Sequence, residues 1–510
     1  MRKPASQKVP QGAPTTAPFM LPPPVGGMNT RDPISALAVT DARSMQNYFP
    51  GSAGVSKRKG TAGHITGTLS ACETLMVYTA NTGTEAMFAA ITTAFYNVTA
   101  AGALGAAVVS GLANSRWQYV NFTNSNGTAY LCAFNGADSP RYWDGATWTA
   151  ITGVSTPAIT GVTTTTLISA ATHQRRLWLV QVNSLKAWYL PVDSVGGAAQ
   201  SIDLGGIANF GGYIMAISTW TVDGGSGMDD YWVAITSAGQ VIAYRGTDPS
   251  SATSWALVGV WNIAQPVGRR CFCQYKGDLL ILTTGGIASF VRIMAGDSAS
   301  SGMLTDKIAP TYISTLGSGD AVPDLWQLLY YPKGDMLIWS AGMERSYAMN
   351  TITGAWAQWS FIARCWAIFN EEPYFARYQN NNVIVRFWIG NQDEANGSTD
   401  AIQGQFFQGY SDFGLPVSSK KTKQVRFLFS GSATWTLDYG LQPDYRTTIQ
   451  SQGPFTSVAA VNGLTNWYPA TANATAFGLY FSSTSSGEDI YNGAYILHEP
   501  GSFVASPGAM

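Results

Sequence analysis

Short aromatic strands separated by glycine-containing turns dominate the chain from about residue 66. The stretch DDYWVAIT (229–236) is followed by SAG and then by QVIAYRG (240–246), a pattern that predicts a β-hairpin with a three-residue loop. SWALVGVW (254–261) follows as a third strand. Apolar residues at helical spacing are almost absent, so we expect an all-β fold.

The same pattern recurs along the chain. An aromatic-rich strand, a turn, a second strand, a glycine turn and a Trp-bearing strand follow one another, and Trp148, Trp255 and Trp356 occupy the last strand. The other copies are AYLCAFNGADSPRYWDGATWTAITG (129–153), RLWLVQVNSLKAWYLP (176–191), GDLLILTTGGIASFV (277–291) and GDMLIWSAGMERSYAMNTITGAWAQWSF (334–361). Repeated meanders of this length predict a β-propeller of about six blades over 66–392. A solenoid or a set of β-sandwiches is the alternative.

The two ends of the chain differ from this body. Residues 1–65 begin with a Pro-rich leader that favours an extended arm. Asp32 before Pro33 predicts a short helical turn, and Asp41 predicts a second one that runs to Asn47. We therefore expect 1–65 to be an N-terminal arm with short helical turns. Within residues 393–510, the segment DEANGSTD (393–400) predicts a polar linker, and the strands after it predict a smaller antiparallel β domain.

Charge is scarce in this sequence. Charged residues make up 12% of the chain, hydrophobic residues 46%, and the net charge is -1, so no overall basic field attracts nucleic acid or a membrane surface. The basic clusters at Lys57–Lys59 and Lys420–Lys423 are expected to be solvated loop residues. No secretory signal and no membrane-spanning segment is predicted, which favours a soluble protein made without export. Five scattered cysteines are expected to be buried free thiols.

The sequence offers little chemistry. His64, His173 and His498 are far apart, and the nucleotide-binding and hydrolase motifs are missing. A glycosidase would need two facing carboxylates, and the carboxylates present, such as Glu371 and Glu372, are expected in loops. WDGATW (143–148) is interpreted as a hairpin turn. No catalytic residue, cofactor or metal ligand is predicted, and we do not expect an enzyme.

The beginning of the chain carries a recognisable combination of motifs. PPPVGGMNTRDPISALAVTDARSMQNYFPGSAGVSKRKGT (22–61) resembles the opening of tail nozzle proteins, also called tail hub or DNA-stabilisation proteins, of short-tailed bacteriophages. The matching residues are Asn29, Arg31, Asp32, Pro33, Asp41, Ala42, Asn47, Tyr48, Phe49, Pro50, Arg58 and Gly60. Similarity continues in 173–197 and 234–271 and is weak after 395.

The resemblance implies a structural virion protein of the phage tail, assembled in the host cytoplasm. Members of that family form a homohexameric tube with a β-propeller body below the portal and adaptor rings, and packaged double-stranded DNA leaves through the bore. Tail fibre or spike proteins are further candidate partners. The resemblance assigns assembly and docking to Asn29, Arg31, Asp32, Pro33, Asp41, Asn47, Tyr48, Phe49 and Pro50.

Two other functions are compatible with the sequence. One is a carbohydrate-binding or carbohydrate-cleaving β-propeller component of a tail, which would use aromatic residues or paired carboxylates. The other is a DNA-binding module, which would need a basic stripe. The low Lys and Arg content favours instead a channel to which DNA does not adhere, because each neutralised phosphate adds affinity through counterion release.

Overall fold

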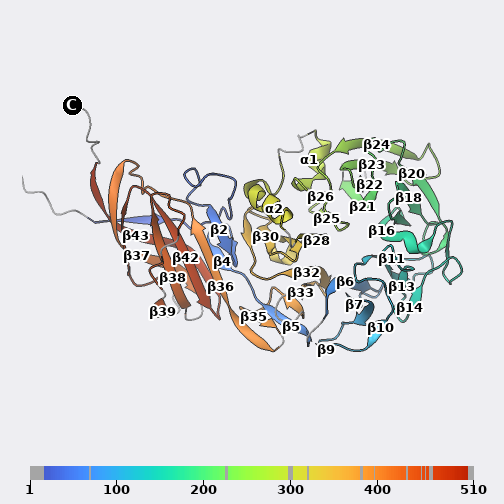
Figure 1. The fold of residues 1–510 in the computed structure, drawn as a ribbon, viewed down its shortest axis with the longest axis horizontal. Helices are drawn as coiled ribbons and strands as arrows, with labels where there is room; N and C mark the ends of the chain where they lie inside the picture. Colours follow the sequence, from blue (N-terminus) through green and yellow to red (C-terminus); the bar gives the residue numbers. More distant parts are fainter. Residues whose placement is uncertain are drawn as a thin grey trace, which may run out of the picture. The chain divides into compact units, whose positions relative to one another are not determined.

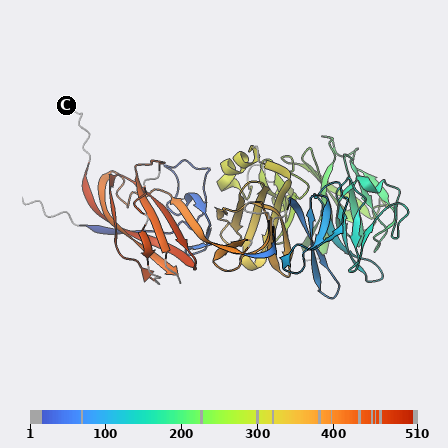
Figure 2. The same cartoon turned by 60° about the horizontal axis from the view of Figure 1, so that its bottom comes forward.

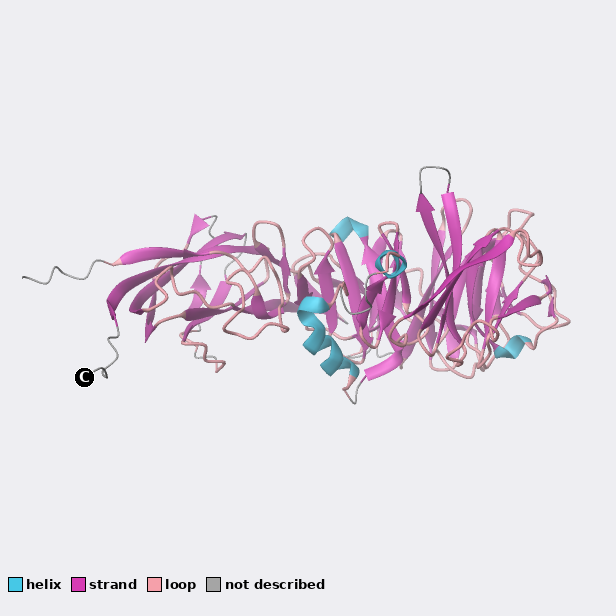
Figure 3. Ribbon diagram, turned by 90° about the horizontal axis from the view of Figure 1, so that it is seen from above, coloured by secondary structure: helices cyan, strands magenta, loops and turns pink. Residues whose placement is uncertain are grey.

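The computed structural model describes residues 16–67, 70–223, 228–296, 302–318, 321–378, 383–395, 397–431, 435–448, 451–453, 455–458 and 463–503. Strands dominate these residues (Figure 3), which confirms the predicted all-β class. The chain forms two compact units. The first contains 1–58, 355–357 and 401–510, and the second contains 59–354 and 358–400. We call the first unit the β domain and the second unit the propeller.

The propeller consists of small antiparallel sheets arranged around a centre (Figure 1). Among the described residues, five are separate sheets with three or four strands. The first sheet contains β6(Cys72–Thr79), β7(Glu85–Ile91), β8(Ala94–Asn97) and β10(Ala107–Val109), and the second contains β11(Gln118–Thr123), β12(Ala129–Phe134), β13(Arg141–Trp143) and β14(Trp148–Ala150). The third sheet contains β16(Leu167–His173), β17(Arg176–Gln181), β18(Lys186–Tyr189) and β20(Gln200–Asp203), and the fourth contains β21(Ile214–Asp223), β22(Met228–Thr236), β23(Gln240–Gly246) and β24(Trp255–Asn262). The fifth sheet contains β25(Phe272–Tyr275), β26(Asp278–Thr283) and β27(Gly286–Ser289).

Two further antiparallel meanders of the same kind complete the ring. The first is β28(Ala321–Tyr331), β29(Met336–Gly342) and β30(Ser346–Asn350), and the second is β32(Ala363–Phe369), β33(Glu372–Arg377), β34(Ile384–Phe387) and β5(Thr61–Thr66). The first strands contact one another in the order β6, β11, β16, β21, β25, β28, β32 and back to β6. The described strands thus close a ring of seven meanders, where about six were expected. The copies recognised in the sequence did not include the first meander or the seventh, whose strands come from two distant parts of the chain.

The ring is closed by a strand from the N-terminal side of the chain. β5 pairs antiparallel with β34, so one meander combines residues more than 300 positions apart. The buried side chain of Ile65 joins a cluster with Leu75, Ala376 and Ile384. Figure 2 shows the same sheets from a second direction. The predicted boundary at 65 is therefore corrected: the propeller begins at 59 and uses β5 as its last strand.

Aromatic side chains fill the space between neighbouring sheets. Trp178 of β17 stacks against Trp255 of β24 with ring centroids 5.5 Å apart, and Tyr244 also stacks on Trp255. Trp148 and Trp255 each begin the fourth strand of a sheet, as the repeat pattern predicts. At the hairpin before β23, Gly239 has φ +87°, and a Cβ there would lie 2.4 Å from the carbonyl oxygen of Ile263. Only glycine fits this turn.

Shorter elements connect the sheets. The hairpin predicted over 277–291 is present as β26 and β27, and β27 passes directly into the short helix α1(Phe290–Met294), which Ser289 caps. The remaining propeller elements are β9(Gly102–Ala103), β15(Ile159–Thr160), η1(Thr164–Thr166), β19(Gly197–Ala198), η2(Asp306–Ile308), α2(Ala309–Leu316), η3(Pro332–Gly334) and β35(Gln392–Ala395), and β31(Trp356–Gln358) spans a boundary between the units. None of the helices among the described residues has the length and apolar content needed to cross a membrane.

The β domain combines the two ends of the chain. One sheet has the order β3, β4, β43, β37 and β40, with β1 on β43 and β41 on β37; the other runs from β2 through β36 and β42 to β38 and β39. Their bounds are β1(Ala17–Leu21), β2(Ala42–Gln46), β3(Tyr48–Pro50), β4(Val55–Lys57), β36(Ser398–Gln408), β37(Ser418–Gly431), β38(Trp435–Pro443), β39(Phe455–Val458), β40(Gly463–Leu464), β41(Tyr468–Ala474), β42(Phe477–Ser485) and β43(Asp489–Phe503). Aromatic rings join the two sheets, such as Phe427 with Phe481 at 5.2 Å and Phe406 with Tyr491 at 5.0 Å.

This arrangement corrects the sequence prediction for the N-terminal segment. Residues 42–46 form β2 rather than a helical turn, because Met45 and Ala42 are buried against the rest of the β domain. Residues 17–21 form β1, an edge strand that tolerates Pro18 because it pairs only with β43. From residue 16 to residue 58 the chain is therefore part of the β domain and not a separate arm. We call these residues the head segment. The N-terminal fifteen residues of the expected arm lie outside the described part of the chain.

Candidate docking site in the head segment

A side-chain cluster closes the loop between residues 29 and 41. The Nδ2 atom of buried Asn29 donates hydrogen bonds to the carboxylates of Asp32 at 2.9 Å and Asp41 at 2.8 Å. The Oδ1 atom of Asn29 accepts the backbone N–H of Asp32 at 3.1 Å, and Arg31 Nε pairs with Asp32 at 2.8 Å. Asn29 therefore holds both ends of the loop and satisfies two carboxylates at once. Its neighbour Gly27 has φ +70°, and a Cβ there would lie 2.6 Å from the Trp356 carbonyl oxygen.

The loop itself presents an exposed surface on this fixed base. Arg31, Pro33, Ser35 and Ala36 are exposed, whereas Leu37 is buried and anchors the middle of the loop. Ile34 packs against a small apolar cluster made by Phe407, Tyr410 and Ala476, with Tyr480 beside it. An ordered, solvent-facing loop loses little conformational entropy on binding, so residues 31–36 are the part of the head segment best suited to contact a partner.

A second cluster fixes the corner between β2 and β3. Asn47 adopts the left-handed conformation with φ 57°, which asparagine tolerates better than most residues. Its Nδ2 atom donates to the carbonyl oxygen of Gln403 at 2.8 Å, and its Oδ1 atom accepts from Arg58 Nε at 2.9 Å. Only 1% of Arg58 is exposed. The corner thus ties the head segment to β36.

A third cluster lies in the core of the β domain. Lys57 Nζ is 3.5 Å from Asp489 Oδ2 and donates to the carbonyl oxygen of Ser485 at 2.9 Å. Ser483 Oγ donates to Asp489 at 2.9 Å and also shares a hydrogen bond of 2.7 Å with Tyr48 Oη. Burial raises the pKa of Asp489 and lowers that of Lys57, while each charge partly offsets the shift in the other.

The nine residues predicted for docking therefore separate into two groups. Arg31 and Pro33 are exposed and Asp32 is half-buried. The other six are buried and hold the head segment inside the β domain: Asn29, Asp41, Asn47, Tyr48, Phe49 and Pro50. Their partners Gln403, Ser483 and Asp489 were not predicted, since no local sequence signal links positions more than 350 residues apart.

The basic clusters also differ from the expectation. Lys57, Arg58 and Lys420 are buried rather than solvated. Lys420 Nζ donates to the carbonyl oxygens of Leu415 at 2.7 Å, Ser418 at 2.9 Å and Thr475 at 2.6 Å. Three backbone acceptors replace the water that an ammonium group needs. These cations are therefore structural and are not presented to an external phosphate.

Thiols and imidazoles serve packing in the described structure. Four of the five cysteines are buried, and Cys273 is partly exposed. Burial raises the pKa of Cys271 and of Cys273 to about 12, which keeps both thiols protonated and unreactive near neutral pH. The Nε2 atom of His64 lies 2.7 Å from the carbonyl oxygen of Val98. Within the described ranges, His, Cys, Asp and Glu side chains form no group of three that could hold a metal ion.

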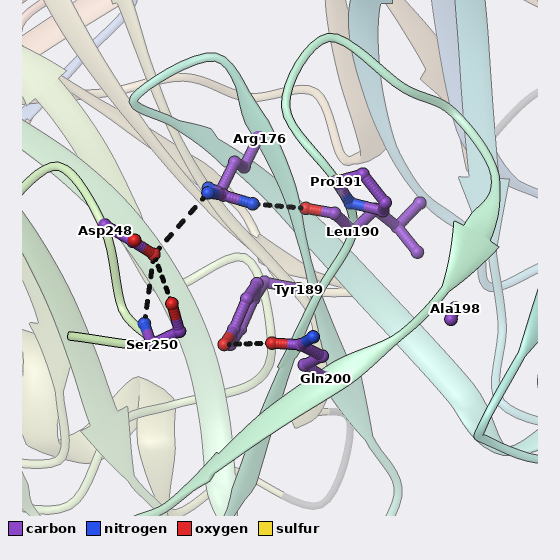
Figure 4. Close-up of a pocket in the computed structure, with 8 residues that line it drawn as sticks. All are labelled: Arg176, Tyr189, Leu190, Pro191, Ala198, Gln200, Asp248 and Ser250. Carbon is purple, nitrogen blue, oxygen red and sulfur yellow. Dashed lines mark hydrogen bonds and ion pairs between the residues drawn. The ribbon is translucent and has the colours of Figure 1, made fainter.

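A small pocket of about 200 Å³ lies beside β17 and β18 of the propeller (Figure 4). Arg176 Nη1 donates to the Leu190 carbonyl oxygen at 3.3 Å, and its Nη2 is 3.6 Å from Asp248. Tyr189 Oη donates to Gln200 Oε1 at 2.8 Å. The polar groups in Figure 4 are thus paired with one another. This pocket is therefore a weaker candidate for a binding site than the solvent-facing residues 31–36, which we call the head loop.

No family model matches the chain, and no curated protein matches it in sequence. Among solved structures, the extracellular domain of a hybrid two-component system from B. thetaiotaomicron is similar over 85% of this chain with a TM-score of 0.41 and 11% identity. The present chain spans 61% of that protein. The β-propeller domain of Cps50 (Swd1) from Myceliophthora thermophila matches 66% of this chain and 99% of its own, with a TM-score of 0.39 and 10% identity. YCF48 from Cyanidioschyzon merolae matches 64% of this chain and 98% of its own, with a TM-score of 0.37 and 13% identity. These likenesses extend to the fold alone.

Proposed function

We propose that the chain is a structural virion protein: the tail nozzle of a short-tailed bacteriophage, which forms a homohexamer below the portal and adaptor rings and provides the channel for double-stranded DNA. The observation that carries this proposal is the resemblance over residues 22–61. That resemblance combines a Pro-Gly-Gly segment, an Asn-x-Arg-Asp-Pro step and an Asn-Tyr-Phe-Pro step within forty residues.

The structure supplies a physical reason for that combination of residues. Gly27 permits the close approach to Trp356, Asn29 closes the loop, and Asn47 forms the left-handed corner. These three motif residues therefore have positions that few other residue types could occupy. These motifs determine how the head segment folds into the β domain. This supports the proposal that the chain shares the architecture of the tail nozzle family.

The charge distribution is compatible with passage of DNA. Lys and Arg number 29 and Asp and Glu number 30 in the whole chain. Three cations of the two basic clusters, Lys57, Arg58 and Lys420, are buried. A channel built from such a chain offers few groups for counterion release, so DNA would slide through it rather than adhere.

Docking through the head loop can be tested with one exposed residue. Ala36→Arg places a long cation on the loop without touching the Asn29 cluster. We expect the association of the chain with a cognate portal–adaptor complex, measured by co-sedimentation, to weaken by about tenfold. Val154→Arg is the matched control, because Val154 is 94% exposed and lies in the propeller.

The nozzle function and the docking surface each have an outcome that would contradict them. If the unmodified chain does not sediment with the portal–adaptor complex, the nozzle function is wrong. If it does and both variants bind equally well, then the nozzle function stands and the head loop is not the docking surface.

A further inference from the structure

A second cavity lies at one end of the propeller ring. It has a volume of about 510 Å³. Its walls come from residues at or just before the first strands of successive meanders, namely Gln118, Ile168, Met215, Arg269 and Asp324, together with neighbouring loop residues. Since the first strands form the inner ring, this cavity is the mouth of the ring axis. Small-molecule sites in proteins commonly have volumes in this range.

Charge in this mouth is arranged unevenly. Arg116 pairs through Nε with Glu73 at 3.2 Å and through Nη1 with Asp324 at 3.2 Å, so one guanidinium neutralises parts of two carboxylates. Arg269 lies in the same wall, and among the described residues it has no carboxylate within ion-pair distance. Its Nη1 atom donates to the Met215 carbonyl oxygen at 3.0 Å. The guanidinium lies over the Tyr213 ring at 5.4 Å from the centroid.

Arg270, the next residue, does not line the cavity, and it too has no carboxylate within ion-pair distance in the described part of the chain. Its Nη2 atom donates to the Glu73 carbonyl oxygen at 2.9 Å and to Thr74 Oγ1 at 2.8 Å. Two guanidinium groups, those of Arg116 and Arg269, and one carboxylate, that of Asp324, therefore line the mouth. A cation removed from water is costly without a counter-charge, so this arrangement favours an anion from outside.

The remaining polar side chains indicate what carries the anion. Asn114 and Gln118 line the same cavity and bring amide groups that can both donate to and accept from hydroxyl groups. Ile168, Met215 and Pro266 provide apolar surface beside them. A guanidinium fork suits a carboxylate, amides suit neighbouring hydroxyls, and apolar patches suit the C–H faces of a sugar ring.

We propose that the mouth of the propeller axis binds an acidic saccharide, with its carboxylate at Arg269 and its hydroxyl groups at Asn114 and Gln118. A glutamate-rich peptide also carries carboxylates that could pair with Arg269, so it is the competing ligand in the titration below. Inorganic phosphate would use the guanidinium but neither the amides nor the apolar surface. This proposal does not depend on the nozzle function.

The direct test is titration calorimetry of the full chain with D-glucuronate, D-glucose, inorganic phosphate and a glutamate-rich peptide. We expect glucuronate to bind at least about tenfold more tightly than glucose, because only the acid can pair with a guanidinium. The proposal is overturned if glucuronate does not bind at millimolar concentration, if glucose binds equally well, or if phosphate or the peptide binds and glucuronate does not.

Two substitutions locate the site. Arg269→Met is expected to weaken glucuronate binding by about tenfold or more. Asp324→Asn removes a competing carboxylate whose side chain is 58% exposed, and we expect it to strengthen binding by about threefold. A gain in affinity cannot result from partial unfolding, so this variant keeps the test sharp if Arg269→Met folds poorly.

Glu371→Gln is the matched control for Asp324→Asn. Glu371 belongs to the exposed ion pair with Lys333, and its position in the β32–β33 turn places it at the opposite end of a first strand from the cavity. It changes the net charge by the same amount as Asp324→Asn. Unchanged affinity in this variant is expected. A gain equal to that of Asp324→Asn would show that overall charge, and not the mouth, controls binding and would overturn the assignment.

Discussion

The ion pair between Lys57 and Asp489 connects the head segment with β43 inside the core of the β domain. Side-chain exposure is 1% for Lys57 and 0% for Asp489. Two buried charges of this kind stabilise a fold only while both are present, because removal of one leaves the other without compensation. The pair therefore determines where the head segment attaches to β43, and it adds little to the free energy of unfolding.

This view predicts a strongly non-additive double-mutant cycle. Lys57→Met or Asp489→Leu alone should each lower the free energy of unfolding of the β domain by about 3–5 kcal/mol. The double variant should lie within about 1 kcal/mol of the original chain, since it removes both charges at similar volume. Urea unfolding monitored by tryptophan fluorescence measures all four proteins. Additive losses would mean that the two charges do not interact.

His173 gives a pH dependence to the propeller. Its side chain is 3% exposed, and its Nδ1 lies 3.0 Å from Thr219 Oγ1. Burial lowers its pKa from 6.5 to about 4. A lowered pKa means that the unfolded chain binds the proton more readily, so the stability from neutral His173 is complete above pH 6.5 and is lost as the pH falls towards 4.

We expect the propeller to lose about 3 kcal/mol of unfolding free energy through this residue between pH 7 and pH 4. His173→Gln should remove that part of the loss, so the two proteins should differ in the slope of stability against pH. Chemical denaturation at several pH values provides the measurement. Parallel slopes would show that His173 is not protonated on unfolding in this range.

At the level of elements, sequence patterns predicted what is local. The 229–246 hairpin and its third strand are present as β22, β23 and β24, because alternation and a Gly turn act over a few residues. The turn expected after Asp32 is present as a single turn, in which the Ala36 N–H donates to the Pro33 carbonyl oxygen at 2.9 Å. The helical turn expected after Asp41 is replaced by β2, because residues 42–46 pair with β36. Pairing of β5 with β34, and of β1 with β43, could not be predicted from one sequence because it joins segments hundreds of residues apart.

The head strands lead to a prediction for truncation. Deletion of residues 1–50 removes β1, β2 and β3, which cover buried residues such as Tyr491 and Phe406. We expect the β domain to lose its cooperative unfolding transition in scanning calorimetry, while the propeller, which begins at 59, keeps its own. A truncated chain that retains both transitions would show that the head segment is a detachable arm after all.

At the scale of the whole molecule, the fold is a ring of small sheets inserted in the sequence between the parts of a β domain. The propeller class could be predicted from repeated strands and tryptophans, because each meander repeats the same local pattern. The candidate docking site was predicted as nine residues of one segment, without separating the exposed residues from the buried ones. Separating its exposed loop from its buried anchors required the long-range partners of Asn47 and Lys57.

The proposed nozzle function requires the chain to assemble as a hexamer. Mass photometry of the purified chain, alone and with a cognate portal–adaptor complex, followed by negative-stain imaging, tests it most directly. We expect particles of six times the 54.4 kDa chain mass, seen as six-fold rings with an axial bore wide enough for duplex DNA. A chain that stays monomeric at micromolar concentration and never joins the portal–adaptor complex would contradict it.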